Sequence, residues 1–364
     1  MAKPRKTSLY HIHESLGAKM IDFAGYLMPI QYSGIKDEHH AVRTSAGIFD
    51  VSHMGEFFVS GSDAEAFLDT VTVGNVSGLH PGDAQYSLMC TTAGGIIDDL
   101  LIYKKQSGYL LVVNAANTES DFAWLNQNIA GDVEIQNISD DTSLIAVQGP
   151  ASRKIIGSLA DCKIDSISFY KFQECLLNGH EVLLARTGYT GELGYEIYFD
   201  EPHAPEIWSA ISDAGGEEIS PAGLGCRDTL RMEMKYCLYG NDIDQNTNPA
   251  EAGLKWTVDL NKPHFIGKDA IVANAKSPSR RLVCIQMSEK AVPRQGYSIW
   301  KGTDQVGVIT SGTMSPSLGI GIGLGYVDAE HSKTGTELSI DIRGKQKSAS
   351  IVKAPFYKNG SLHD

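Results

Sequence analysis

The alternation of apolar and polar positions predicts a chain built from helices and antiparallel strands. Three β-prone segments follow one another with short turns between them, a spacing that is typical of an antiparallel meander. They are residues 86–91, 96–103 and 109–114. A second hairpin pattern covers residues 181–199 around a glycine-rich stretch at 188–194, and shorter strands are predicted at 57–59 and 144–147.

Helical periodicity predicts several helices between these strands. They lie at residues 35–46, 62–71, 117–129, 150–159, 204–214 and 223–236. Gly47 is predicted to end the first of them. Ser62 and Glu65 are predicted to form a capping box at the start of the second. The rest of residues 1–50 is expected to be mostly loop.

From Arg281 onward the pattern changes to short strands separated by glycine turns, which indicates a separate β-barrel or sandwich. We place the boundary in the polar stretch at 276–279, so residues 1–276 and 280–364 are expected to form different domains. Antiparallel strand blocks mixed with helices, without strict βα alternation, indicate an α+β fold.

Composition and charge exclude several classes of function. The formal net charge of −13 argues against a nucleic-acid binder, and the short basic run at 3–6 is expected to be a solvated terminus. No apolar run approaches about 18 residues, so no membrane span is expected. The 6 cysteines include no C-x-x-C pair, which fits reduced thiols in a cytoplasmic protein.

Familiar cofactor and metal motifs are not found in the sequence. His13 and Glu14 begin like a zinc-binding helix, but position 17 is glycine, and His39 and His40 face different directions on a helix. We therefore expect no metal site. The glycines at 319–325 are spaced by two, which suits a strand or turn better than a dinucleotide-binding loop.

Two adjacent aspartates, Asp98 and Asp99, interrupt an otherwise apolar strand. Strand alternation places them on opposite faces. One would face water and the other the interior or a cavity, where a carboxylate marks a functional site only in some proteins. The alternative is a pair of turn-proximal aspartates that cap a hairpin, and from these residues alone both interpretations stay open.

Several segments taken together and in order resemble the aminomethyltransferase family of the glycine cleavage system. They are Gly94-Gly95-Ile96-Ile97-Asp98-Asp99-Leu100 and residues 41–43, 47–54, 186–196, 221–228, 238–242 and 310–316. The resemblance covers about residues 9–360. It implies an α+β fold of antiparallel-sheet folate-binding domains with a C-terminal β-barrel or jelly-roll-like domain, three lobes around a central folate cavity. It also implies two interleaved α+β subdomains within residues 1–276.

The resemblance implies a one-carbon transfer. The methylene of an aminomethyl group on the lipoyl arm of a carrier protein passes to tetrahydrofolate, which gives 5,10-methylenetetrahydrofolate, ammonia and the dihydrolipoyl carrier. The expected partners are thus a lipoylated carrier protein and tetrahydrofolate as co-substrate. A fixed carboxylate in a water-poor cleft can orient the folate amine and stabilise the developing positive charge. By resemblance, Asp99 has this role.

The resemblance also implies the residues that bind the folate. Glu196, in preference to Glu192, would accept hydrogen bonds from the pterin, and Arg227 would bind a pterin carbonyl or the glutamate carboxylate. Asn114 can donate and accept beside Asp99, and Met54 is expected in the same cleft. The tyrosines that could form aromatic walls, with core packing as the alternative for each, are Tyr86, Tyr103, Tyr189 and Tyr236.

Some positions depart from the family pattern. Tyr26 stands where the family usually has tryptophan, Cys226 replaces a frequent alanine and Asn241 a frequent glutamine. These departures put only local packing in doubt. Because the family's carrier is acidic, we expect a local basic patch at the entrance for the lipoyl arm. Its candidates are Arg294, Lys255 and Lys262.

Two alternative functions are open. One is a folate-dependent demethylase that acts on a small sulfur or amine compound. The other is a non-catalytic folate-binding protein for iron–sulfur repair, a group that carries a Lys-Gly-Cys-Tyr-x-Gly-Gln motif. Tyr236 and Leu238 replace two residues of that motif here, so Cys237 is interpreted as a thiol on a helix face.

Overall fold

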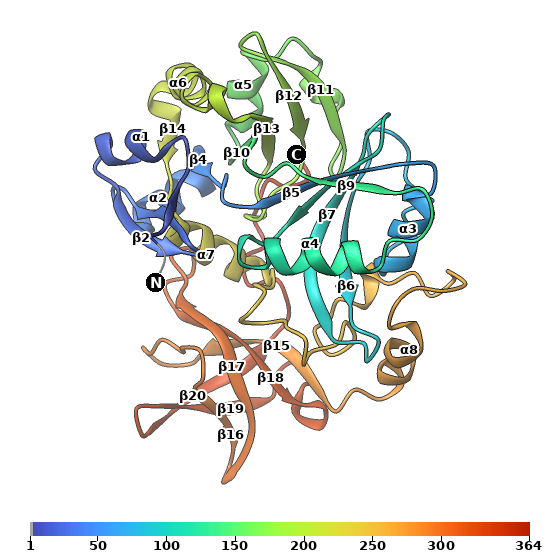
Figure 1. Ribbon diagram of the computed structural model, residues 1–364. Helices are drawn as coiled ribbons and strands as arrows, with labels where there is room; N and C mark the ends of the chain where they lie inside the picture. Colours follow the sequence, from blue (N-terminus) through green and yellow to red (C-terminus); the bar gives the residue numbers. More distant parts are fainter. Residues whose placement is uncertain (1–2) are drawn as a thin grey trace.

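A computed structural model describes residues 3–364 and shows an α+β chain of three sheets and a closed barrel (Figure 1). The predicted fold class is confirmed. In Figure 1 the barrel strands lie at the bottom, and the two larger sheets lie above them. None of the helices in residues 3–364 is long and apolar enough to cross a membrane.

The predicted meander forms the centre of a five-stranded sheet. The strand order is β6-β7-β8-β5-β9, and all the pairs are antiparallel. The strands are β5 (Gly55–Ser60), β6 (Ala84–Cys90), β7 (Ile96–Lys104), β8 (Tyr109–Val113) and β9 (Glu134–Asn137). Helices α3 (Ala64–Val71) and α4 (Thr118–Gln127) bury Phe67, Leu68 and Leu125 in the same core as this sheet.

The strands of a six-stranded sheet lie before and after those of the first sheet along the chain. Its order is β11-β12-β13-β10-β4-β14, antiparallel throughout except for the parallel pair β4–β14. The strands are β4 (Ala46–Asp50), β10 (Thr142–Gln148), β11 (Phe172–Leu177), β12 (His180–Ala185), β13 (Gly194–Asp200) and β14 (Ile219–Pro221). The apolar residues of α5 (Ser152–Gly157) and α6 (Ala204–Gly215) join the sheet's core, which buries Ile155, Ile207 and Trp208.

The first 34 residues contain more regular structure than the sequence pattern indicates. Helix α1 (Tyr10–Ser15) is followed by β2 (Lys19–Phe23) and β3 (Tyr26–Gln31). The predicted loop is therefore wrong, and the basic run at the terminus, although exposed, pairs with β3 as strand β1 (Arg5–Lys6). Helices α2 (Ile35–Thr44) and α7 (Leu224–Met234) pack on each other, and α7 also packs on β3.

The C-terminal strands close into a barrel. Their order is β15-β18-β17-β16-β19-β20, all antiparallel, and their interior is a separate apolar cluster. They are β15 (Arg280–Met287), β16 (Ser298–Lys301), β17 (Asp304–Met314), β18 (Gly321–Asp328), β19 (Glu337–Ile342) and β20 (Lys345–Val352). Helix α8 (Lys268–Lys276) precedes them. The glycines spaced by two at 319–325 lie in and just before β18, which confirms the predicted strand or turn.

Three predicted helix ends are wrong because tertiary contacts override the local signals. Gly47 lies inside β4, and α2 already ends at Thr44. Ser62 does not cap a helix, because its hydroxyl donates to Asp132 and α3 begins only at Ala64. Helix α7 ends at Met234, so Cys237 is a buried residue of the following loop and not a thiol on a helix face.

A buried network of charges joins the helices to the barrel. Glu233 of α7 accepts hydrogen bonds from Arg43 of α2 at 2.8 Å and from the hydroxyl of Ser317, after β17, at 2.9 Å. Ser315 also donates to Glu233, and His39 lies 3.3 Å from it. Since Glu233 is fully buried, these contacts hold three distant parts of the chain in one arrangement.

Candidate active site

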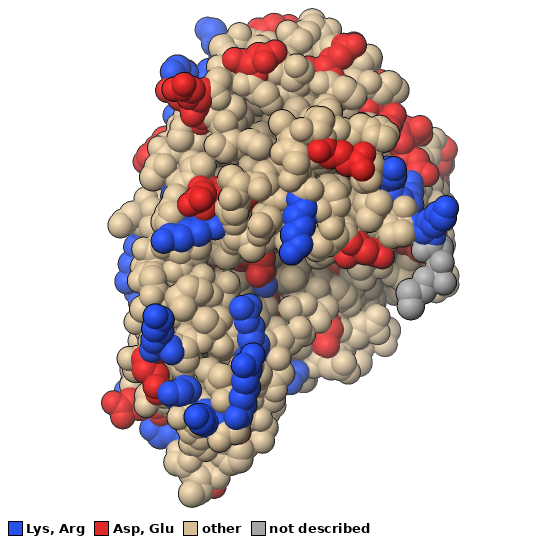
Figure 2. Space-filling model, turned by 90° about the vertical axis from the view of Figure 1, so that its left-hand side faces the viewer, with Lys and Arg blue, Asp and Glu red and all other residues tan. Residues whose placement is uncertain are grey.

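A large cavity lies where the sheets, α7 and the barrel meet. Its volume is about 1520 Å³. Eight of the nine predicted site residues line it: Met54, Tyr86, Asp99, Asn114, Tyr189, Glu196, Arg227 and Tyr236. These residues come from segments as far apart as positions 54 and 236, so the fold gathers them from across the chain. The surface above the barrel is hollowed on the face that Figure 2 shows.

The two aspartates of β7 point to opposite faces of the sheet, as strand alternation predicts. Asp98 is fully buried, and it accepts hydrogen bonds from Nδ2 of Asn114 and Nδ2 of Asn117, each at 2.8 Å. Asp99 faces the cavity, where its carboxylate accepts a hydrogen bond from the hydroxyl of Tyr86 at 3.0 Å. Neither faces the outer surface, so the expectation that one of them faces water is corrected.

Asn114 connects the two carboxylates. It directly follows β8, the neighbour of β7, and its Nδ2 donates to Asp98 and, at 2.9 Å, to Asp99. Gly95 brings this hairpin close to another loop, because a Cβ there would lie 1.9 Å from the carbonyl oxygen of Gln245. The turn before β7 therefore needs glycine, and it fixes where Asp99 enters the cavity.

Burial controls the charge of these acids. Burial, together with the neighbouring charge of Asp98, raises the pKa of Asp99 to about 7. Asp121 of α4 is a third buried carboxyl, and no amide or hydroxyl group within residues 3–364 donates to its oxygens, so its hydrogen-bond partner is the carboxyl of Asp98. Burial and the charge of Asp98 raise the pKa of Asp121 strongly. Asp121 is therefore protonated and neutral near neutral pH, which reduces the electrostatic repulsion on Asp98 and Asp99.

Glu196 and Arg227 provide a second polar group in the cavity. Glu196 lies on β13, where it accepts a hydrogen bond from Thr187. Burial raises the pKa of Glu196, whereas the Thr187 bond and the Arg227 charge oppose the rise. Arg227 lies in the first turn of α7, which can approach β3 because a Cβ on Gly223 would lie 2.5 Å from the backbone of Ile30.

Aromatic rings form flat walls in the cavity. Tyr189 and Tyr236 stack with their centroids 5.7 Å apart, and the Arg227 guanidinium lies 4.4 Å from the Tyr189 centroid. Tyr86 stacks on Trp256 at 5.7 Å. Trp256, whose side chain is 69% exposed, was not predicted because it lies in a polar segment without an apolar pattern.

Tyr103 lies outside the set of lining residues, so the structure does not support it as a wall of the cavity. Its ring is fully buried, and its hydroxyl bonds to the hydroxyls of Tyr198 at 2.9 Å and Thr187 at 3.2 Å. Thr187 in turn donates to Glu196. Tyr103 is therefore a core residue, which was the alternative interpretation of its sequence position. Its hydroxyl contacts Thr187, the residue that donates a hydrogen bond to Glu196.

His53 is a further residue that lines the cavity and was not among the predicted site residues. Its side chain is buried, its Nδ1 has no hydrogen-bond partner in the described chain, and burial lowers its pKa to about 4. It is therefore a neutral imidazole at physiological pH. Its signal was the segment at 47–54 that supports the family resemblance, but Met54 was the residue of that segment predicted to lie in the cleft.

The three basic candidates for the entrance differ in their surroundings. Arg294 is exposed and lines the cavity, and Lys255 is exposed beside Trp256. Lys262 is buried, with its Nζ donating to the carbonyl oxygens of Thr72 and Gly74 at 2.7 and 2.6 Å. Lys262 is thus a structural residue, and that part of the hypothesis is wrong.

Comparison with known proteins identifies the family. A model described as the GCVT N-terminal domain matches residues 9–262, and one described as the glycine cleavage T-protein C-terminal barrel domain matches residues 280–358. The chain belongs to the glycine cleavage T-protein family.

Whole-chain relatives agree with the family models. The chain is 50% identical to an aminomethyltransferase of Chloroherpeton thalassium and 48% identical to one of Halothermothrix orenii. Each match covers 97% of this chain and 99% of the relative. The crystal structure of the glycine cleavage system aminomethyltransferase T from Bartonella henselae is similar at 31% identity, with a TM-score of 0.92 over 98% of this chain and 99% of that one.

Proposed function

We propose that this chain is the aminomethyltransferase of a glycine cleavage system. The methylene carbon of an aminomethyl group on a lipoyl arm leaves sulfur and nitrogen and becomes bonded to N5 and N10 of tetrahydrofolate. Ammonia and the dihydrolipoyl carrier are the other products. The names of the relatives and the match over nearly the whole chain support this reaction.

The observation that carries the proposal is the position of Asp99 in the cavity. Tyr86 and Asn114 hold its carboxylate from two sides, so it is oriented before substrate arrives. A fixed carboxylate of this kind stabilises positive charge that develops on the reacting carbon and nitrogen, at no further cost of reorganisation. The ammonium of the aminomethyl group favours the ionised form of Asp99 when it enters the site.

The other cavity residues fit a folate. Glu196 can accept hydrogen bonds from the pterin amino and amide groups, and Arg227 offers planar donors to a carbonyl or a carboxylate. The stacked pair Tyr189 and Tyr236 offers flat apolar surface for the aromatic rings of the ligand. A cavity of about 1520 Å³ exceeds the roughly 300–1,000 Å³ of common ligand sites, which leaves room for a lipoyl arm beside the folate.

The direct test mixes purified protein, aminomethylated carrier and tetrahydrofolate, and measures ammonia and 5,10-methylenetetrahydrofolate. The proposal expects both products in equal amounts. Methyltetrahydrofolate made from a small methylated compound would instead indicate the demethylase. Folate binding without turnover would indicate the non-catalytic binding protein, and absence of folate binding would contradict the whole assignment.

The reaction rate is expected to fall on the acid side with an apparent pKa of about 7. Asp99 stabilises positive charge only when ionised, and since its pKa is raised, the ionised fraction decreases as the pH drops through that value. Values of kcat/KM for the carrier across the pH range measure this decrease, because they report the pKa of Asp99 in the free protein, whereas the bound ammonium lowers that pKa in the complex. Folate binding followed over the same range is the control, and a rate that stays level below neutral pH would contradict the role of Asp99.

We propose that the acidic carrier docks beside the barrel. Residues 280–364 carry 11 Lys and Arg against 7 Asp and Glu, whereas the rest of the chain carries 20 against 37. On the face shown in Figure 2, Lys and Arg side chains gather on the lower part, below the hollow. Arg294 lies in this basic part of the chain and at the cavity, so an acidic partner that docks there can place its lipoyl arm inside.

Replacing Arg294 with glutamate is expected to raise the KM for the carrier and to leave folate binding unchanged. The reason is that Arg294→Glu puts a negative charge where the acidic carrier approaches. Steady-state kinetics with varied carrier, at low and high salt, measure the effect, which salt should weaken. Lys163→Glu is the matched control, because Lys163 is exposed and lies away from the cavity. Equal KM values for both variants would contradict this docking surface.

The proposal includes the domain organisation and the location. We propose that residues 1–276 form two interleaved α+β subdomains and residues 280–364 the barrel domain. The support is that the five strands β5 to β9 of one larger sheet are inserted along the chain between β4 and β10 of the other, while all six barrel strands lie in the second part. A cytoplasmic location is proposed as well, which the free state of the six cysteines supports.

A further inference from the structure

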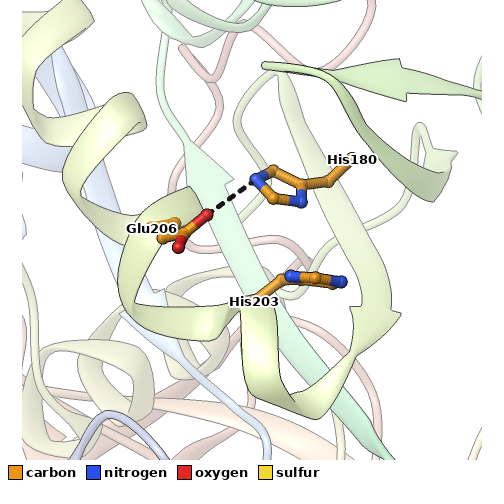
Figure 3. A group of neighbouring side chains, drawn as sticks. All are labelled: His180, His203 and Glu206. Atoms are coloured by element: carbon orange, nitrogen blue, oxygen red, sulfur yellow. Dashed lines mark ion pairs between the residues drawn. The ribbon is translucent and has the colours of Figure 1, made fainter.

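Two histidines and a glutamate come together beside the turn of the β11–β12 hairpin, away from the cavity. His180 begins β12, His203 ends the short 3-10 helix Glu201–His203, and Glu206 lies in the first turn of α6. Figure 3 shows the two imidazole rings side by side, with Glu206 directed at His180. Nε2 of His180 is 3.1 Å from Oε2 of Glu206, and the ring centroids are 4.4 Å apart.

We propose that His180, His203 and Glu206 form a binding site for a divalent transition-metal ion, of which Zn²⁺ is the best fit. One possible ligand atom from each residue lies within 4.8 Å of the other two. Zinc takes imidazole nitrogen and carboxylate oxygen at about 2.0–2.2 Å, and two imidazoles with one carboxylate are an established donor set for it. Mg²⁺ and Ca²⁺ prefer oxygen ligands and are not expected here.

The ligand atoms are free to bind. Within residues 3–364 no hydrogen bond engages the His203 ring, and the only contact of the His180 ring nitrogens is the one with Glu206. The Glu206 side chain is 69% exposed, so it can rotate by the small amount needed to bring its oxygen to a shared ion. Solvent at this open side can complete a four-coordinate site.

The backbone around the ligands is well fixed. Asn178 and Gly179 form the tight turn before His180, with φ of 50° and 83°. His203 and Glu206 are three residues apart at the start of α6, a spacing that places side chains on one face of a helix. A bound ion would therefore join the hairpin β11–β12 to α6 without distorting either.

The proposed metal is not part of the transfer reaction, because none of the three residues lines the cavity. Its expected effect is to stabilise the folded chain, since an ion that binds only the folded arrangement shifts the unfolding equilibrium. The proposal departs from the sequence-based expectation of no metal site. Positions 180, 203 and 206 have no motif spacing, so the sequence did not show the cluster.

The test uses the full-length protein after chelator treatment and removal of the chelator. Titration with Zn²⁺ alone, followed by calorimetry and by the melting temperature, is expected to show one bound ion and a higher Tm, and Mg²⁺ is expected to show neither. His203→Asn is expected to weaken Zn²⁺ binding at least about tenfold, because even the loss of an outer-shell partner of a metal ligand typically costs about 10- to 100-fold in affinity. Glu206→Gln is expected to weaken it less.

The matched control is His11→Asn. His11 and Glu14 also form an exposed pair at 3.1 Å, but without a second histidine. This variant should bind Zn²⁺ like the original protein. The proposal is overturned if the original protein takes up no Zn²⁺, or if His203→Asn and Glu206→Gln both bind it as tightly as His11→Asn does.

Discussion

Replacing Asp99 with asparagine is expected to lower kcat for aminomethyl transfer by about 10²- to 10³-fold, the usual cost of losing one fixed electrostatic group. The Asp99→Asn change keeps the size of the side chain and a hydrogen-bond acceptor for Tyr86, but it removes the negative charge. Folate binding should change little, because Glu196 and Arg227 remain in place. Single-turnover rates with saturating carrier, beside folate titrations, separate the two effects.

The contrasting variant is Asp98→Asn. Asp98 is on the opposite face of β7, and it accepts hydrogen bonds from the backbone N–H and the side chain of Asn114 and from Asn117. Compared with Asp99→Asn, the Asp98→Asn change is expected to reduce the stability of the chain more and to reduce turnover less. If Asp98→Asn lost turnover while Asp99→Asn kept it, the essential carboxylate would be Asp98.

The second large effect concerns stability. Glu233→Ala is expected to reduce the free energy of unfolding by about 3–5 kcal/mol, because it breaks a buried ion pair with Arg43 and leaves the hydroxyls of Ser315 and Ser317 without their acceptor. Arg43 keeps its second buried partner, Glu192, at 2.8 Å. The matched control is Glu218→Ala, which breaks the exposed ion pair with Lys154 at 2.6 Å. That change should cost at most about 1 kcal/mol. Urea unfolding followed by tryptophan fluorescence compares the two variants.

The pH dependence of stability provides a further measurement of Glu233. Its hydrogen bonds and the nearby positive charges lower the pKa of Glu233 to about 2, although burial opposes this. A carboxyl with a depressed pKa stabilises the folded state above its unfolded pKa, about 4.3, and this contribution is lost as the pH falls toward 2. Equal losses in Glu233→Ala and Glu218→Ala at neutral pH, or an unchanged acid response in Glu233→Ala, would contradict the role of this network.

Local signals predicted the regular elements well where side-chain pattern and backbone preference agree. The meander β6–β7–β8 was confirmed because its apolar alternation and glycine turns specify both strands and connections. The predicted helix boundaries were wrong at Gly47 and Ser62. Gly47 lies within strand β4, and the Ser62 hydroxyl donates to the distant Asp132 and does not cap a helix. The same limitation hid β2 and β3, which pair with each other and leave many side chains exposed or only half buried.

The site was predicted to a different extent for each residue. The family motif gave the position of Asp99 in the chain, and strand alternation predicted that Asp98 and Asp99 point apart. Nothing local distinguished Tyr103, which is core, from Tyr86, which lines the cavity, because both lie on apolar strands. Trp256 and His53 were missed for the same reason: exposure to a cavity depends on segments that are far away in the sequence.

The sequence by itself determined the α+β class, the order of most elements, the overall acidity and the family to which the chain belongs. These properties follow from composition, from the periodicity of apolar residues and from motifs in a fixed order, none of which requires knowledge of contacts between distant segments. Only the tertiary structure decided that Lys262 is buried, that Asp121 lies near the Asp98–Asp99 pair, and that His180, His203 and Glu206 meet. Such contacts join residues through the closure of long loops, and their charge states depend on burial that no local segment specifies.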